Sequence, residues 1–189
     1  SVGGNICNAA PAADLLPPLI AHDATVGIVS HSGERIVPVS EFVTGPGTTA
    51  IVANELVTRI DIPPSPLFAP TTYRYYRKVA ARRSNALSKL SVYIAALVVH
   101  HIVVKISIAI GAVAPTVVRC TEAEESLIGA GSDDLRFIDS TFLDLYDRLI
   151  EPIDDQRSNA DYRRRTVLRL LQHALTHDLP RYIDNLEER

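Results

Sequence analysis

A candidate ligand-binding segment lies at the start of the chain, where Gly3 and Gly4 are adjacent and precede Asn5. Because glycine has no Cβ, the main chain of such a segment can approach a ligand closely. The small residues that follow would lose much conformational entropy on folding unless they packed against something. Two interpretations fit this pattern: a ligand-binding turn, or a tight turn with a purely structural role.

Histidine and cysteine give weaker signals of chemistry. His100 and His101 are adjacent, so on a strand they would point to opposite faces of the sheet, and no acidic residue or cysteine lies near them in sequence. We therefore expect no metal site. Cys7 and Cys120 have no partnering His or Asp motif, which argues against a catalytic thiol. Two cysteines are also too few for a disulfide framework, so a reducing, cytoplasmic setting is expected.

The composition excludes two broad classes of protein. The chain has 189 residues, of which 47% are hydrophobic and 22% charged, as in ordinary globular proteins. A net charge of −3 and a pI near 6.0 argue against a dedicated nucleic-acid binder. The longest apolar stretch, from Tyr93 to Ile110, is interrupted by polar residues, so we predict no membrane span. The sequence contains no methionine, and we expect it to begin inside a longer protein.

Prolines and apolar spacing predict the elements of the first third of the chain. Pro17 and Pro18 should shorten or distort a short helix. The proline-rich segment 63–66 is a stiff linker, which we take as a domain boundary. The expected elements are a helix over 11–21, a hairpin of strands 25–31 and 35–39 with its turn at 32–34, a loop over 42–47 and a strand over 56–62.

Strands precede helices in the remaining sequence, which favours an α+β fold with a three-stranded antiparallel sheet packed against helices. In 102–110 the apolar residues alternate, so Lys105 and Ser107 should lie on the opposite face of the strand. The expected elements are a strand over 72–80, a polar, basic loop over 81–89, and paired strands over 90–99 and 102–110, with His100 and His101 at their turn.

Three helices are expected after residue 120. Thr121 and Glu124 have the spacing of a capping box, and Gly129 should end the helix that they open. Ser132 or Asp133 should cap a longer helix that stops before residue 152. Its expected buried residues are Leu135, Ile138, Phe142, Leu145 and Leu149. The last helix should begin at 158–161, with Val167, Leu170, Leu171, Ala174 and Leu175 buried, and with Arg163, Arg164 and Arg165 facing solvent or a partner subunit.

The start of the chain resembles the motif S/T-I-G-G-N-I-x-x-A-S-P-x-x-D-L. This motif is found in the FAD-binding subunits of the molybdenum hydroxylases, which include xanthine dehydrogenase and carbon monoxide dehydrogenase. Val2 stands for the usual Ile, and Ala10 for the usual Ser. The residues that match are Ser1, Gly3, Gly4, Asn5, Ile6, Ala9, Pro11, Asp14 and Leu15.

Further similar segments, in the family's order, extend the resemblance over essentially the entire chain. They lie at 41–46, 54–63, 108–119, 152–158 and 162–163. In this family an FAD-binding domain of the p-cresol methylhydroxylase type precedes a smaller α+β C-terminal domain. The resemblance implies that residues 1–63 are the end of the FAD-binding domain and residues 64–189 the C-terminal domain. The family's glycine-rich loop, which cradles the FAD pyrophosphate, has no counterpart in this sequence.

The resemblance implies eight cofactor-binding residues, and no catalytic or metal-binding ones. Asp14 would accept hydrogen bonds from ribityl or ribose hydroxyls, or else be a surface helix residue. Val57 would contact the cofactor, or only pack in the core. Lys78 would stabilise negative charge on reduced flavin, or lie in a solvated basic stretch. The other five, which would approach the flavin through backbone N–H groups and short side chains, are Ser1, Val2, Gly3, Gly4 and Asn5.

The resemblance also implies a function for the intact enzyme. A substrate would be hydroxylated at a molybdopterin centre in another subunit, and electrons would pass through [2Fe-2S] clusters to FAD and then to NAD or another acceptor. This chain would line one side of the flavin and dock against the iron–sulfur and molybdopterin subunits. The alternative hypothesis is a non-catalytic scaffold that keeps the fold without FAD. An unrelated nucleotide-binding protein has little support, because neither a phosphate loop nor a Rossmann glycine fingerprint is present.

Overall fold

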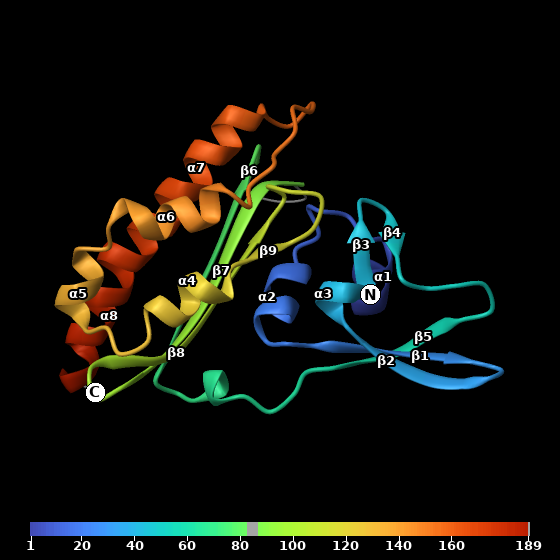
Figure 1. The fold of residues 1–189 in the computed structure, drawn as a ribbon, viewed down its shortest axis with the longest axis horizontal. Helices are drawn as coiled ribbons and strands as arrows, with labels where there is room; N and C mark the ends of the chain where they lie inside the picture. The colour runs from blue at the N-terminus through green and yellow to red at the C-terminus, as the bar shows by residue number, and fades with distance from the viewer. Residues whose placement is uncertain (83–86, 189) are drawn as a thin grey trace.

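The computed structural model describes residues 1–82 and 87–188, and its elements form the α+β fold that the sequence predicts. A three-stranded antiparallel sheet lies within residues 25–61 and a four-stranded antiparallel sheet within residues 72–119; the parts of the chain before and after residue 65 are called its first and second halves below. In Figure 1 the helices drawn in yellow to red cover one face of the four-stranded sheet, and the short blue helix α2 (Leu16–Ala21) lies on its other side. The second sheet is therefore covered on both faces.

The chain begins with helix α1 (Val2–Cys7), so the Gly-Gly-Asn sequence lies in a helix and the predicted turn is wrong. Ser1 is the N-cap residue, and its Oγ accepts a hydrogen bond from the N–H of Gly4 at 3.0 Å. This cap and the complete burial of Ile6 stabilise a helix that two glycines would otherwise disfavour.

Helix α2 begins at Leu16, later than the predicted start at residue 11. Pro17 and Pro18 lie in its first turn, where a missing N–H group costs nothing. The prolines therefore fix where the helix starts, and the segment 8–15 before it is a series of turns that passes beside the second sheet.

The first sheet confirms the predicted hairpin and the strand that follows it. Its strands run in the order β2-β1-β5, with β1 (Thr25–Ser30), β2 (Gly33–Pro38) and β5 (Leu56–Asp61). Of the loop predicted over 42–47, only residues 46 and 47 form a turn, because Phe42 and Val43 are buried in the core and belong to regular elements. The elements there are α3 (Val39–Phe42) and the short strand pair β3 (Val43–Gly45) and β4 (Thr48–Thr49).

The second sheet contains the three predicted strands and a fourth, two-residue strand at its edge. In the order β6-β7-β8-β9, these are β6 (Thr72–Ala80), β7 (Ser88–Val99), β8 (Ile102–Gly111) and β9 (Val118–Arg119). The 3-10 turn η1 (Pro66–Phe68) precedes it. His100 and His101 form the β7–β8 turn as predicted, both with positive φ. The predicted loop over 81–89 lies partly outside the described residues.

The alternation predicted for 102–110 is interrupted by a β-bulge in β8, where Val104 has no partner of its own on β7. Ile102 and Val104 are partly exposed, whereas Val103 is completely buried. The prediction of a single apolar face is therefore correct only for the part of the strand that follows the bulge. Ser107 lies on the opposite face as predicted, but it is also buried, because α2 and η1 cover that face.

The capping box predicted at the start of α4 (Thr121–Ser126) is wrong, since Cys120 is the N-cap residue and makes no side-chain cap. The carboxylate of Glu124 instead faces the core, where it accepts hydrogen bonds from the Ile108 N–H at 2.7 Å and from the Arg119 guanidinium. This interaction satisfies a buried carboxylate, whereas a capping box would have left it in solvent.

The longer helix predicted after residue 132 is divided into two. Asp139 accepts a hydrogen bond from the Phe142 N–H and so begins a new helix. Tyr146 is completely buried at the end of that helix, while Leu149, expected on the buried face, lies beyond it and is 43% exposed. The two helices are α5 (Ser132–Arg136) and α6 (Ser140–Asp147).

The predicted last helix is confirmed, with Asn159 as its N-cap residue. One residue of it was misplaced by the prediction: Arg163 was expected to face solvent or a partner subunit, but it is buried. The segment consists of α7 (Ala160–His173), the π-helical turn η2 (Ala174–Asp178), α8 (Leu179–Asp184) and η3 (Asn185–Glu188). Within the described part of the chain, no helix has both the length and the hydropathy needed to cross a bilayer.

Candidate functional site

A groove of about 500 Å³ lies where the segment after α1 meets β6 and the loop before α7. It brings together three of the eight residues that the sequence predicts to bind a cofactor: Asn5, Asp14 and Lys78. Arg157, from the loop that precedes α7, also lines the groove. The described lining consists of Asn5, Asn8, Ala10, Pro11, Ala12, Ala13, Asp14, Lys78, Leu87 and Arg157.

Asp14 and Lys78 form an ion pair across the groove wall, with Lys78 Nζ 2.7 Å from Asp14 Oδ2. Ser88 Oγ donates to the other carboxylate oxygen at 3.0 Å, and the Tyr76 hydroxyl donates to the Asp14 carbonyl at 3.2 Å. Tyr76 and Lys78 lie two residues apart on β6 and so share a face of the sheet. Burial, together with the negative charge of Asp14, raises the pKa of Tyr76 to about 12, so its hydroxyl remains a donor at neutral pH.

Asn5 contributes an unsatisfied polar atom. Its Oδ1 is buried and has no hydrogen-bond partner among the residues that the structure describes. A buried acceptor without a donor costs about 1–3 kcal/mol. Asn5 lines the groove, but this oxygen is closed off from solvent, so the side chain would have to turn before a ligand could bond to it.

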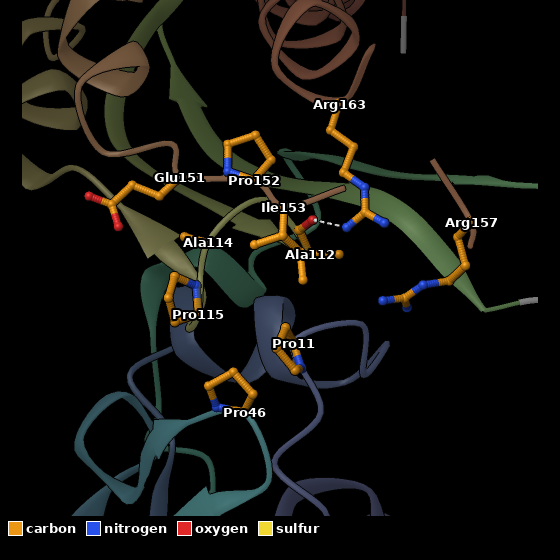
Figure 2. A pocket seen from close by; sticks show the side chains of 10 residues that line it. All are labelled: Pro11, Pro46, Ala112, Ala114, Pro115, Glu151, Pro152, Ile153, Arg157 and Arg163. Carbon is orange, nitrogen blue, oxygen red and sulfur yellow. Dashed lines mark hydrogen bonds between the residues drawn. The ribbon is translucent and has the colours of Figure 1, made fainter. Parts of the chain in front are cut away.

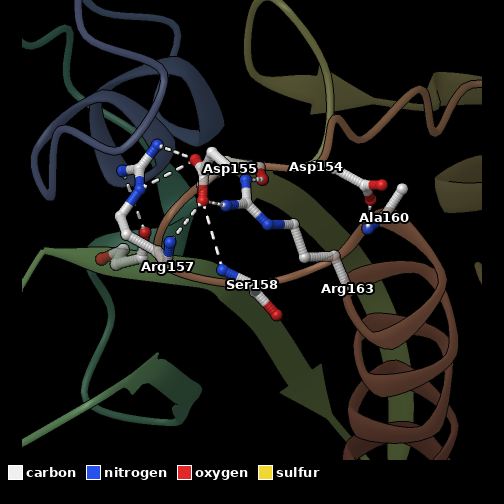
Figure 3. Close-up of polar contacts among 8 residues, drawn as sticks. Asp154, Asp155, Arg157, Ser158, Ala160 and Arg163 are labelled. Atoms are coloured by element: carbon white, nitrogen blue, oxygen red, sulfur yellow. Dashed lines mark hydrogen bonds and ion pairs between the residues drawn. The ribbon is translucent and has the colours of Figure 1, made fainter.

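Arg157 is held in the groove wall by Asp155 (Figure 3). Its Nε and Nη2 atoms lie 2.9 and 2.6 Å from Asp155 Oδ2, and its Nη1 donates to the Ser88 carbonyl at 3.4 Å. Arg163 Nη2 reaches Asp155 Oδ1 at 2.5 Å from the first turn of α7. Hydrogen bonds from Arg157 outweigh the effect of burial and lower the pKa of Asp155, so this carboxylate is ionised at neutral pH.

A smaller cavity of about 90 Å³ lies between the two halves of the chain (Figure 2). Pro11 and Pro46 line it from the first half, and Pro115 and Pro152 from the second. Its wall is mostly apolar, and it has room for only a few water molecules. Three charged residues, Glu151, Arg157 and Arg163, also line it, and Arg157 lines the larger groove as well.

The remaining sequence-predicted residues lie elsewhere. Ser1, Val2, Gly3 and Gly4 form the N-terminal end of α1, and the N–H of Gly4 is already bonded to Ser1 Oγ. Val57 lies on β5 and packs, partly buried, against the core of the first half. None of these five is in the described lining of the groove.

Three residues around the groove were missed by the sequence analysis: Ser88, Asp155 and Arg157. The 152–158 segment was noted only as a family-like motif without a role. Asp155 is acidic and Arg157 is basic, and they lie two positions apart in the sequence, which could have indicated a local ion pair. Their proximity to Asp14 could not be foreseen, because it depends on how the two halves pack.

Comparisons with known proteins assign the chain to a family. Residues 74–177, more than half of the chain, match the CO dehydrogenase flavoprotein C-terminal domain, and residues 1–65 match the FAD binding domain in molybdopterin dehydrogenase. The chain therefore belongs to the CO dehydrogenase flavoprotein C-terminal domain family. This confirms the family resemblance and, with the fold, the predicted α+β class. FAD, the expected cofactor, is the one named for the domain that residues 1–65 match.

Individual relatives support the same assignment. The chain is 32% identical to the xanthine dehydrogenase FAD-binding subunit of Escherichia coli O157:H7, over 66% of this chain and 42% of that protein. It is also 32% identical to the glyceraldehyde dehydrogenase medium chain of Sulfolobus acidocaldarius, over 92% of this chain and 59% of that one. A chain of carbon monoxide dehydrogenase from Hydrogenophaga pseudoflava superposes with a TM-score of 0.80 at 27% identity, covering 93% of this chain and 59% of its own length. The chain thus spans about half the length of these relatives.

Proposed function

We propose that this chain is part of the FAD-binding subunit of a molybdopterin-dependent hydroxylase or dehydrogenase, and that its groove lines one side of the flavin. In the intact enzyme, FAD would receive electrons from [2Fe-2S] clusters and pass them to NAD or another acceptor. The observation that carries this proposal is the ion pair between Asp14 and Lys78. Asp14, which belongs to the family-like motif at the start of the chain, and Lys78, which by resemblance would lie near the flavin, are far apart in sequence and meet in one groove.

Each groove residue has a role that fits its chemistry. The Asp14 carboxylate would accept hydrogen bonds from ligand hydroxyls. The Lys78 ammonium would supply positive charge near the flavin, where reduction adds negative charge. Asn5, which lines the groove, would contribute its side-chain amide as a hydrogen-bonding group. When bound, FAD supplies the redox chemistry, and these residues hold it and tune it.

The proposed partners are an iron–sulfur subunit and a molybdopterin subunit of the same enzyme. The names of the relatives support a multi-chain assembly, since one is a medium chain and another is subunit alpha of the 6-hydroxypseudooxynicotine dehydrogenase complex of Paenarthrobacter nicotinovorans. A cytoplasmic location belongs to the same proposal.

The second candidate is a scaffold that keeps the fold without FAD. One observation favours it: Asp14 and Lys78 already neutralise each other, so neither requires a ligand to be satisfied. A measurement of whether the chain binds FAD distinguishes the FAD-binding function from the scaffold function.

The test is retention of FAD after incubation and desalting, followed by its visible absorption. We expect the wild-type chain to retain the flavin band. Asp14→Asn and Lys78→Gln should each weaken FAD binding about tenfold, because each removes a charge-assisted hydrogen bond. Asp161→Asn and Arg165→Gln, which alter an exposed ion pair on α7, are the matched controls. A folded wild-type chain that stays colourless would contradict the proposal and favour the scaffold.

A further inference from the structure

The outer strand of the second sheet, β6, has one paired edge and one open edge. Among the described strands only β7 pairs with it, and at the start of this ladder the N–H of Val98 donates to the Thr71 carbonyl. In an antiparallel pair the hydrogen-bonded positions alternate along each strand. Counted from Thr71, the N–H and C=O groups of Arg74, Tyr76 and Lys78 therefore point away from β7, out of the edge of the sheet.

None of these outward groups has a hydrogen-bond partner among residues 1–82 and 87–188. The N–H of Thr72, which precedes them, is bonded to the Ala69 carbonyl at 3.1 Å, so the open edge begins after this residue. From residue 74 to residue 78 the edge is about 17 Å long, at about 3.3 Å per residue. An extended segment of five residues would pair with its full length, and open edges of this kind are where a further strand adds to a sheet.

The open edge is positively charged, although the whole chain carries a net charge of −3. Arg74 and Arg77 are both exposed, and neither forms an ion pair within the described part of the chain. Arg74 donates to the carbonyls of Leu67 and Ala69, which carry no charge that would offset a guanidinium. Both arginines are therefore available to an acidic partner.

Two carboxylates near the strand reduce this charge without removing it. Asp14 neutralises Lys78. Asp178 lies in η2, and burial raises the pKa of Tyr75, with Arg77 and Asp178 acting on that pKa in opposite directions. When both carboxylates are counted, the strand and its neighbours still carry a net positive charge.

The other outer strands do not offer an equivalent edge. β2 and β5 have six residues each, and β9 has two. Charges of both signs lie on β2 and β5, where Arg59 pairs with Glu34 and Asp61. Of the described outer strands, β6 is therefore the one whose length and charge can select a partner.

A second copy of this chain fits the edge poorly. In an antiparallel pair of β6 strands centred on Tyr76, Arg74 of one copy would lie opposite Lys78 of the other. Like charges directly opposite each other on a sheet are destabilising. An acidic strand would instead place carboxylates beside Arg74 and Arg77, and Tyr76, which is 43% exposed, would give its side chains an aromatic surface.

We propose that the open edge of β6 binds an extended acidic segment of a partner protein, which adds a fifth strand to the four-stranded sheet. Backbone hydrogen bonds to Arg74, Tyr76 and Lys78 supply the pairing, and the guanidinium groups of Arg74 and Arg77 supply the preference for acidic side chains. The pairing uses the backbone of Lys78 and not its ammonium group, so it does not depend on FAD binding.

The probe is a capped nine-residue peptide of valine, threonine and four glutamates, titrated against the chain by calorimetry. One matched peptide has lysines in place of the glutamates, and another is N-methylated at its five central residues, which then cannot donate backbone hydrogen bonds. The acidic peptide should bind at least tenfold more tightly than either. In the complex, amide exchange at Arg74, Tyr76 and Lys78 should slow, because their N–H groups become bonded.

Variants locate the binding on the strand. Tyr76→Pro removes an outward N–H, which an edge strand tolerates, and should weaken binding of the acidic peptide at least tenfold relative to Tyr76→Ala, which keeps the N–H. Arg77→Glu should weaken it about tenfold and should improve binding of the lysine peptide. Arg148→Glu, which alters an exposed arginine at the end of α6, is the matched charge control and should bind like wild type. Circular dichroism checks that each variant is folded.

The proposal is overturned if wild type does not bind the acidic peptide at about 1 mM, or if either matched peptide binds as tightly. A folded Tyr76→Pro chain that binds like Tyr76→Ala also overturns it. If Tyr76→Pro does not fold, amide exchange in wild type decides, and unchanged rates at Arg74, Tyr76 and Lys78 with the peptide bound rule out the edge. Sedimentation tests the second copy: a dimer that Arg77→Glu leaves intact and Tyr76→Pro dissociates would assign the edge to self-pairing instead.

Discussion

At the scale of single residues, the loop before α7 depends on Asp155. Its carboxylate accepts from the side chains of Arg157 and Arg163 and from the N–H of Ser158. These interactions lower its pKa, with hydrogen bonding to Arg157 the largest cause. Because the folded-state pKa lies below that of the unfolded chain, the carboxylate stabilises the fold fully above a pH of about 4. This contribution is lost as the pH falls from there through the folded-state pKa.

Asp155→Asn should therefore lower the free energy of unfolding by about 3 kcal/mol at neutral pH, because it leaves the charge of Arg163 buried without a partner. The difference from wild type should shrink as the pH falls below about 4, where the wild-type carboxylate begins to be protonated. Urea unfolding over a series of pH values measures both effects. Asp161→Asn, in an exposed pair, should cost less than about 0.5 kcal/mol. Equal losses for the two variants would show that Asp155 is only another surface charge.

Sequence alone identified some of these residues and misplaced others. Asp14 was predicted from the family-like motif at the start of the chain and Lys78 from its correspondence to a family lysine, and the structure brings the two together. Arg163 was expected on the exposed or partner-facing side of its helix, since three consecutive arginines normally surround a helix with charge. Its burial depends on Asp155 and the Ala112 carbonyl, which lie on other segments. Periodicity within one helix contains no information about such partners.

At the scale of elements, the groove depends on how closely α2 packs on the four-stranded sheet. Gly111, the last residue of β8, lies at the contact: an added Cβ would be 2.7 Å from Ser91 Oγ and 2.9 Å from Pro17 Cγ. Such distances are too short for any side chain, so the glycine is required by close approach. Since α2 follows almost directly after Asp14, this packing also sets the position of Asp14 relative to Lys78.

Gly111→Ala should lower the free energy of unfolding by about 2 kcal/mol, because the methyl group forces α2 away from the sheet. FAD binding, if the proposed function holds, should weaken in the same variant. Adding Ser91→Ala removes one of the two clashing atoms and should restore part of the loss, with Ser91→Ala alone as the control. Urea unfolding of wild type, the two single variants and the double variant measures these free energies. If Gly111→Ala unfolds with the same free energy as wild type, α2 is not held tightly against the sheet.

The elements that were correctly predicted are those with strong local patterns. The strand over 25–31 was recognised from its apolar and β-branched residues, the strand over 72–80 from its tyrosines, and the last helix from its spacing. The failures occurred where a tertiary contact overrides the local pattern. Glu124 has the spacing of a cap, yet it faces the core because Ile108 and Arg119 lie there. The two glycines of α1 favour a turn locally, but Ser1 and the burial of Ile6 stabilise a helix.

At the scale of the whole molecule, Arg119 connects the two halves. Its Nη1 donates to Asp23 at 2.6 Å and to the Ile20 carbonyl at 3.1 Å, both in or beside α2. Its Nε and Nη2 donate to Glu124, whose side chain is only 6% exposed and which also bonds to β8. The first half alone has a small core, so its stability should depend on docking against the sheet of the second half.

Arg119→Met should therefore destabilise both halves together, by about 3 kcal/mol, because it leaves Glu124 buried without its cation. All seven tyrosines lie after residue 72, so near-ultraviolet circular dichroism reports the second half, while hydrogen exchange of β1 amides reports the first. In urea unfolding, both probes should report the same decrease in the free energy of unfolding. Arg136→Met, which removes an exposed arginine paired with Asp133 and Asp184, should cost much less. If β1 exchange alone accelerates while the tyrosine signal stays unchanged, the halves unfold independently. The groove between them would then be set by docking alone, and not by a single cooperative fold.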